Sequence, residues 1–136
     1  MKELILYYSF SGNTKKYAED LAKSTGADLC EITEVKKRSK LGAFIPGIIQ
    51  VMRCAKSKIN PVSVDLSQYD KIIIAFPVWA DHQPPAINSA VDLLPEGKSV
   101  ELILISASGK SNSQQIADMI KAKKCEVISV KDVQIK

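Results

Sequence analysis

The chain has 136 residues, of which 46% are hydrophobic and 25% are charged. This length suits a single domain over residues 1–136, and the composition excludes a disordered or fibrous chain. The net charge of +4 is unevenly distributed, because residues 36–58 hold seven Lys or Arg and no Asp or Glu. Such a segment indicates an acidic partner, an anionic surface or a solvated face, and we expect no nucleic-acid partner.

Three cysteines, Cys30, Cys54 and Cys125, lie far apart in the sequence. They form no CxxC motif and no Cys/His pairing, so no metal site is predicted. Buried or half-buried thiols in a reducing compartment are expected instead. The N-terminus shows no charged-then-apolar signal segment, which predicts a cytoplasmic location.

The predicted elements alternate between strand and helix along the chain. Residues 2–8 form an apolar run that predicts a buried strand, and residues 13–23 place apolar side chains at helical spacing before Gly26. Further strands are predicted over residues 28–33, 71–76, 100–106 and 126–133, and further helices over residues 46–56, 85–94 and 113–123.

Strict alternation predicts an α/β fold with a five-stranded, doubly wound parallel sheet. The first, third and fourth strands are almost continuously apolar, as central strands should be, whereas the second and fifth are diluted with polar residues. This contrast predicts the order 2-1-3-4-5. Ligands bind such sheets at the carboxyl ends of the strands, at the switch point between strands 1 and 3.

The loop SFSGNT follows the first strand and precedes the first helix. Because first-turn N–H groups lack intrahelical partners and carry the positive end of the helix dipole, the loop predicts a phosphate site. The alternative is that Ser11 or Asn13 only caps the helix. The predicted phosphate-binding residues are Ser9, Phe10, Ser11, Gly12, Asn13 and Thr14.

Two further loops are predicted to meet this one. The loop after the third strand carries the only tryptophan of the chain, and its location favours a flat ligand stacked on the ring over a purely structural role. The loop after the fourth strand is small and rich in donors. The residues concerned are Pro77, Val78, Trp79 and Ala80 in the former and Ser106, Ala107, Ser108 and Gly109 in the latter. The sequence contains neither GxxxxGK[ST] nor GxGxxG.

With these motifs the chain resembles the flavodoxin-like family over nearly its whole length. The resemblance implies non-covalent FMN and electron transfer between a reductase and an acceptor, which is a redox partner protein or a small molecule. No catalytic side chain is assigned. Two alternatives stay open: an enzyme that takes hydride from NAD(P)H and reduces a quinone or similar acceptor, and a flavin-free interaction module of the same fold.

The sequence departs from the family pattern in three places. Ala80, Asp81 and His82 stand where a glycine often follows the aromatic residue, and His82 is interpreted as an exposed loop residue. The basic segment of residues 36–58 is expected to pack its apolar positions on the sheet rather than contact a membrane. The final helix of the family is missing, which predicts a bare sheet face over strands 4 and 5 and therefore a homodimer.

Overall fold

The computed structural model describes residues 2–35 and 56–135. The helix predicted over residues 46–56 lies outside this part apart from Lys56, as do Cys54 and most of the basic segment. The described elements are β1 (Glu3–Tyr7), α1 (Asn13–Thr25), β2 (Asp28–Glu31), the 3-10 helix η1 (Leu66–Gln68), β3 (Lys71–Pro77), α3 (Pro85–Val91), β4 (Ser99–Ser106), α4 (Gln114–Ala122) and β5 (Glu126–Gln134).

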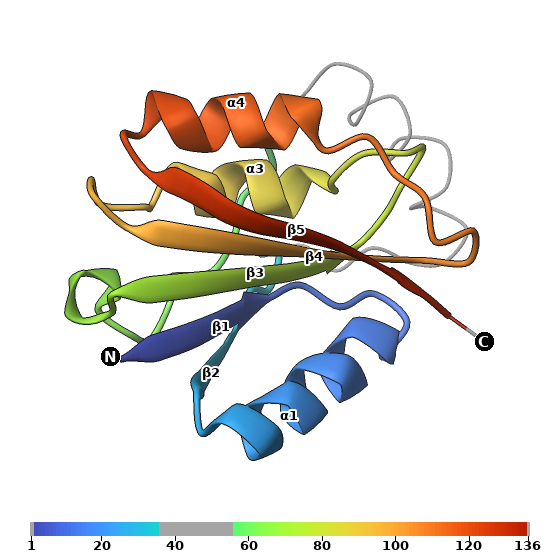
Figure 1. The fold of residues 1–136 in the computed structure, drawn as a ribbon, viewed down its shortest axis with the longest axis horizontal. Coiled ribbons are helices and arrows are strands. Elements are labelled where there is room, and N and C mark those ends of the chain that lie inside the picture. The colour runs from blue at the N-terminus through green and yellow to red at the C-terminus, as the bar shows by residue number, and fades with distance from the viewer. Residues whose placement is uncertain (1, 36–55, 136) are drawn as a thin grey trace.

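All five strands form one parallel sheet in the order β2-β1-β3-β4-β5, which confirms the predicted topology. Figure 1 shows α3 and α4 on one face of the sheet and α1 on the other. Because successive side chains of a strand point to opposite faces, the central strands contribute to two apolar clusters. Leu4, Ile72 and Leu102 belong to the cluster beneath α3 and α4, and Ile5 and Ile73 to the one beneath α1.

Two predicted elements end two or more residues earlier than the sequence indicated. Helix α3 stops at Val91 instead of residue 94, because the N–H groups of Leu93 and Leu94 donate to carbonyls only three residues back and Pro95 follows. Strand β2 stops at Glu31 instead of residue 33, because Thr33 instead pairs with the segment around Asn60.

The predicted bare sheet face is only partly present. Over β4 the prediction is wrong, because Ile103 and Ile105 are only 1% and 3% exposed. Both belong to the apolar cluster beneath α1, and Val133 of β5 packs against the same cluster. Strand β5 itself is exposed along most of its length, with Ile128 48% and Val130 45% exposed. The homodimer therefore stays a prediction.

The two cysteines within the described residues, Cys30 and Cys125, are buried free thiols, as expected. The part of the chain that the structure describes contains no helix long and apolar enough to cross a membrane. Among these same residues, no group of three or more His, Cys, Asp or Glu is placed to hold a metal ion.

Candidate functional site

The three loops singled out from the sequence all leave the sheet at the carboxyl ends of β1, β3 and β4. Figure 1 shows these carboxyl ends on the side of the molecule where β5 also ends. Strands β1 and β3 are neighbours, although α1 and β2 separate them in the sequence, so the winding direction reverses between them. The topology thus places the loops at the switch point where parallel sheets bind ligands.

Helix α1 begins without a side-chain cap. Its N-cap residue is Gly12, whose φ of 101° and ψ of −13° lie in the left-handed region, and no side chain bonds the first-turn N–H groups. The alternative in which Ser11 or Asn13 caps the helix is therefore wrong. The first turn also contains no acidic residue, so its N–H groups and its dipole are available to an anion.

Internal hydrogen bonds orient the hydroxyl groups of this loop. The Ser9 Oγ accepts from the N–H of Gly12 at 3.1 Å, and the Ser11 Oγ accepts from the Nδ2 of Asn13 at 3.3 Å. A hydroxyl that accepts a bond in this way still has its own hydrogen to donate. Both serines are thus set up as donors. Thr14 lies deeper, at 2% exposure, in the first turn of α1.

Two cations in this turn were not predicted as part of the site. Lys15 and Lys16 are exposed in the first turn of α1, and neither forms an ion pair with a described residue. Positive charge at a helix N-terminus is unfavourable for the helix dipole but favourable for a bound anion. The signal was present in the sequence as a Lys pair directly after SFSGNT.

The loop after β3 forms a tight reversal that exposes its tip. The backbone groups of Trp79 and His82 bond each other reciprocally at 2.8 and 2.9 Å, while Ala80 and Asp81 between them have φ of 48° and 68°. Two central residues with positive φ define a type I′ turn. The turn is held to the next loop, since the N–H of Asn112 donates to the Asp81 carbonyl at 2.7 Å.

Trp79 joins the first two loops through aromatic contacts. Its ring meets Tyr8 edge-on, with centroids 6.1 Å apart and an interplanar angle of 76°, and meets Phe10 at 5.7 Å and 61°. The side chain is half-buried and also packs against the main core. Flat stacking of a ligand on this indole stays a prediction.

His82 departs from its predicted exposed position. The residue is half-buried, and its Nδ1 is buried with no hydrogen-bond partner among the described residues. The next residue, Gln83, is 1% exposed and donates to the Oδ1 of Asn88 at 2.8 Å. The type I′ turn causes this difference, because it folds the chain back against the body of the protein after Asp81.

Several polar groups of the loop after β4 form hydrogen bonds within the protein. The Ser106 Oγ accepts from the N–H of Gly109 at 2.9 Å, and the Ala107 carbonyl accepts from the Nε2 of Gln134 at 3.1 Å. Ser108 bonds the backbone of Lys110. These bonds hold the loop to itself and to β5, and the contact of its residues with a ligand stays a prediction.

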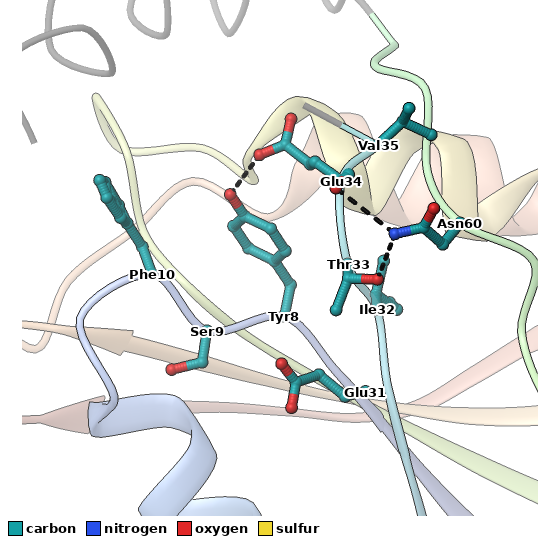
Figure 2. A pocket seen from close by; sticks show the side chains of 9 residues that line it. All are labelled: Tyr8, Ser9, Phe10, Glu31, Ile32, Thr33, Glu34, Val35 and Asn60. Carbon is teal, nitrogen blue, oxygen red and sulfur yellow. Dashed lines mark hydrogen bonds between the residues drawn. The ribbon is translucent and has the colours of Figure 1, made fainter. Parts of the chain in front are cut away.

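A cavity of about 500 Å³ opens beside the first loop, on its β2 side. Figure 2 shows side chains reaching it from the β1 loop on one side and from the segment after β2 on the other. Of the predicted site residues, only Ser9 and Phe10 line it. The sequence reasoning missed the other seven, which are Tyr8, Glu31, Ile32, Thr33, Glu34, Val35 and Asn60.

The cavity could have been anticipated from the predicted strand order. That order places the carboxyl end of β2 beside that of β1, so residues 31–35 are expected to lie near Tyr8. The contribution of Asn60 could not be foreseen, because it depends on the bond from its Nδ2 to the Oγ1 of Thr33 at 2.8 Å.

Comparison with solved structures identifies the fold. A flavoprotein of Lactobacillus acidophilus in complex with FMN is 24% identical, with a TM-score of 0.77 over 95% of this chain and 91% of the other. A protein of Bacteroides uniformis is 19% identical, with a TM-score of 0.80 over 95% and 88%. Oxidised flavodoxin 1 of Bacillus cereus is 17% identical, with a TM-score of 0.55 over 100% and 87%.

No protein-family model and no curated protein sequence matches this chain. The structural likeness extends over nearly the whole chain and agrees with the observed strand order, the parallel pairing and the helices on both faces of the sheet. The chain therefore has the flavodoxin-like α/β fold.

Proposed function

We propose that this protein binds FMN at the carboxyl ends of β1, β3 and β4 and transfers electrons between a reductase and an acceptor. The observation that carries the proposal is the N-terminus of α1, which has no side-chain cap and no acidic residue in its first turn. A phosphate group is the ligand that such a helix end favours. The solved neighbour with FMN adds support at the level of the fold.

The residues of the first loop fit a phosphate dianion. The hydroxyls of Ser9 and Ser11 already accept internal bonds and retain a hydrogen to donate, and Gly12 presents backbone with no Cβ in the way. Lys15 and Lys16 add positive charge without entering a fixed ion pair within the described part of the chain. In this proposal Ser9, Ser11 and the first-turn N–H groups of α1 hold the phosphate.

The aromatic residues at the other end of the site fit a planar ring. Trp79 and Phe10 come from different loops, and their ring centroids lie 5.7 Å apart. Together they form an apolar wall at the carboxyl ends of the strands. FMN supplies the redox chemistry, since its ring takes up and releases electrons. The protein's own residues bind the cofactor, orient it and limit its access to water, and none of them is required to act as acid, base or nucleophile.

Cofactor titration of the flavin-free protein tests the proposal. Trp79 is the only tryptophan, so its fluorescence reports on this site alone. We expect quenching by FMN and about 10-fold to 100-fold weaker binding of riboflavin, because hydrogen bonds to a charged group contribute about 1.5–3 kcal/mol. Equal affinity for FMN and riboflavin would refute the phosphate site, and no uptake of either would indicate a flavin-free module.

Variants of the loop identify the groups that hold the phosphate. Ser9→Ala and Ser11→Ala together should weaken FMN binding while leaving riboflavin binding unchanged. Ser24→Ala is a matched control, because that hydroxyl donates to the Leu21 carbonyl near the other end of α1. Mixing the FMN-loaded protein with NADPH in the absence of oxygen then separates the two redox roles, since bleaching of the flavin without added reductase would indicate an enzyme that oxidises NADPH itself.

A further inference from the structure

The loop after β3 is fixed to the rest of the protein by backbone hydrogen bonds at two points. At its start, the N–H of Val78 donates to the carbonyl of Ile105 in β4 at 2.9 Å. At its tip, the N–H of Asn112, in the segment before α4, donates to the carbonyl of Asp81 at 2.7 Å. The end of the loop, where the chain turns into α3, is held by a side chain instead.

That side chain belongs to Gln83, which directly follows the type I′ turn and is 1% exposed. Its Nε2 donates to the Oδ1 of Asn88 in α3 at 2.8 Å and to the Oε1 of Gln115 in α4 at 3.1 Å. An amide nitrogen has two hydrogens to donate, so both are used. Because α3 and α4 cover the same face of the sheet (Figure 1), one side chain connects the loop to both helices.

The amide of Gln83 is poorly suited to stabilising the fold. Its Oε1 is buried and has no hydrogen-bond partner among residues 2–35 and 56–135. A buried acceptor without a partner costs free energy that an apolar side chain of similar size would not incur. What the amide supplies instead is a fixed orientation, since its two donor bonds hold the side chain in one place between the helices.

The position of Gln83 is coupled to that of Trp79 through the turn between them. The N–H of Trp79 donates to the carbonyl of His82 at 2.8 Å, and the N–H of His82 donates to the carbonyl of Trp79 at 2.9 Å. These two bonds close the four-residue turn, so a shift of His82 moves Trp79 with it. The indole also lies beside Phe10 of the first loop, with ring centroids 5.7 Å apart. The bonds of Gln83 therefore affect the aromatic surface of the proposed cofactor site.

We infer that Gln83 is a positioning residue for the flavin ring: its bonds to α3 and α4 hold the turn, and the turn holds the Trp79 indole at the cofactor site. This inference rests on the proposed function, which places the ring against Trp79 and Phe10. Gln83 itself is buried and acts only through the turn. Loss of its amide should therefore weaken contacts to the ring and leave the phosphate contacts of the first loop unchanged.

Gln83→Leu removes the amide and keeps a side chain of similar size. In the flavin-free protein, quenching of Trp79 fluorescence by acrylamide measures how accessible the indole is from solvent. We expect the quenching constant to rise about twofold or more, because a loop without this attachment opens more often. Trp79 is the only tryptophan, and the measurement needs no cofactor. It therefore tests the attachment of the turn separately from flavin binding.

Titration with FMN and with riboflavin, followed by flavin fluorescence, shows which end of the cofactor site is affected. The two flavins share the ring, so we expect Gln83→Leu to weaken both by a similar factor, about twofold to tenfold for a loosened aromatic contact. Ser9→Ala with Ser11→Ala should weaken FMN alone. A loss confined to FMN in Gln83→Leu, or unchanged binding of both flavins, would overturn the inference.

Two controls separate positioning from general effects. Gln114→Leu is the matched substitution, because the Nε2 of Gln114 donates to Asp118 of the same helix instead of holding the loop. Gly97→Ala controls for lost stability, because Gly97 lies before β4 with φ of 79°, where an L-residue is strained. Both controls should keep the acrylamide quenching and the flavin affinity of the wild type. A rise in quenching in either control equal to that in Gln83→Leu would overturn the inference.

Gln115→Leu tests the same attachment from the side of α4. This change leaves Gln83 in place and removes one of its two acceptors, so quenching should rise by less than in Gln83→Leu. Gln115 is half-buried, and circular dichroism confirms that each variant folds. Unchanged quenching in both variants would show that the amide does not hold the turn. If the wild type took up no flavin, the proposed function would fail, while a rise in quenching would still support the attachment of Trp79 by Gln83.

Discussion

The backbone of Gly12 offers a direct test of the first loop. With φ at 101°, Gly12 lies in the left-handed region, and an added Cβ would meet no atom within 4 Å. The cost of Gly12→Ala therefore comes from backbone conformation and not from a clash. An L-residue in this region costs about 1–2 kcal/mol, and the stiffer unfolded chain returns about 0.4–1 kcal/mol. We expect a net loss of about 1 kcal/mol in the free energy of unfolding.

Gly97 provides the matched control. It has φ of 79° and equally open surroundings, so Gly97→Ala should lower the free energy of unfolding by a similar or slightly smaller amount. Urea denaturation of the flavin-free variants measures both losses. The variants should differ in FMN affinity, however. Relief of strain at Gly12 turns the first-turn N–H groups away from the phosphate, and about a tenfold loss is expected there, whereas Gly97→Ala should bind FMN as the wild type does.

Two results would refute this reasoning. If Gly12→Ala unfolded at the same urea concentration as the wild type, the left-handed conformation would not be required at this position. If both alanine variants lost FMN affinity equally, the loss would reflect general destabilisation and not the geometry of the loop. Titration of each variant with FMN, followed by Trp79 fluorescence, distinguishes these outcomes.

Four further predictions concern other parts of the molecule. Burial and the hydrogen bond to Glu31 raise the pKa of Tyr7 from 10.0 to about 12. The protonated tyrosine therefore stabilises the folded state fully below about pH 10, and this contribution is lost as the pH rises towards 12. Tyr7→Phe should reduce the loss of unfolding free energy between these two pH values, as measured by urea unfolding. Phe76 is fully buried, and Phe76→Ala should cost about 3–5 kcal/mol in the same unfolding assay; a loss below about 1 kcal/mol would contradict its place in the core. Lys15→Gln with Lys16→Gln should weaken FMN binding severalfold at low salt and little at high salt, and a salt-independent loss would show that the lysines act other than by charge. Val130 is exposed on the edge strand β5, so Val130→Lys should weaken the predicted homodimer in sedimentation velocity at about 10 µM; a wild-type monomer at that concentration would refute self-association.

Local pattern was sufficient for most of the fold. The apolar runs that became β1, β3 and β4 differ visibly from the diluted β2 and β5, and this contrast predicted the sheet order that the structure confirms. The position of the SFSGNT loop at the switch point followed from that order. Whether a strand is buried depends on the composition of a run of residues, so it can be predicted from the sequence without knowledge of any single contact.

The details of the site depended on contacts between distant segments. The sequence could not reveal that Gly12 replaces a side-chain cap, that Trp79 packs edge-on against Phe10, or that the type I′ turn withdraws His82 from solvent. Nor did it reveal the cavity that Glu31 and Glu34 share with the β1 loop. Periodicity and composition are sums over neighbours in the chain, whereas side-chain orientation is decided by packing between loops that only the folded sheet brings together.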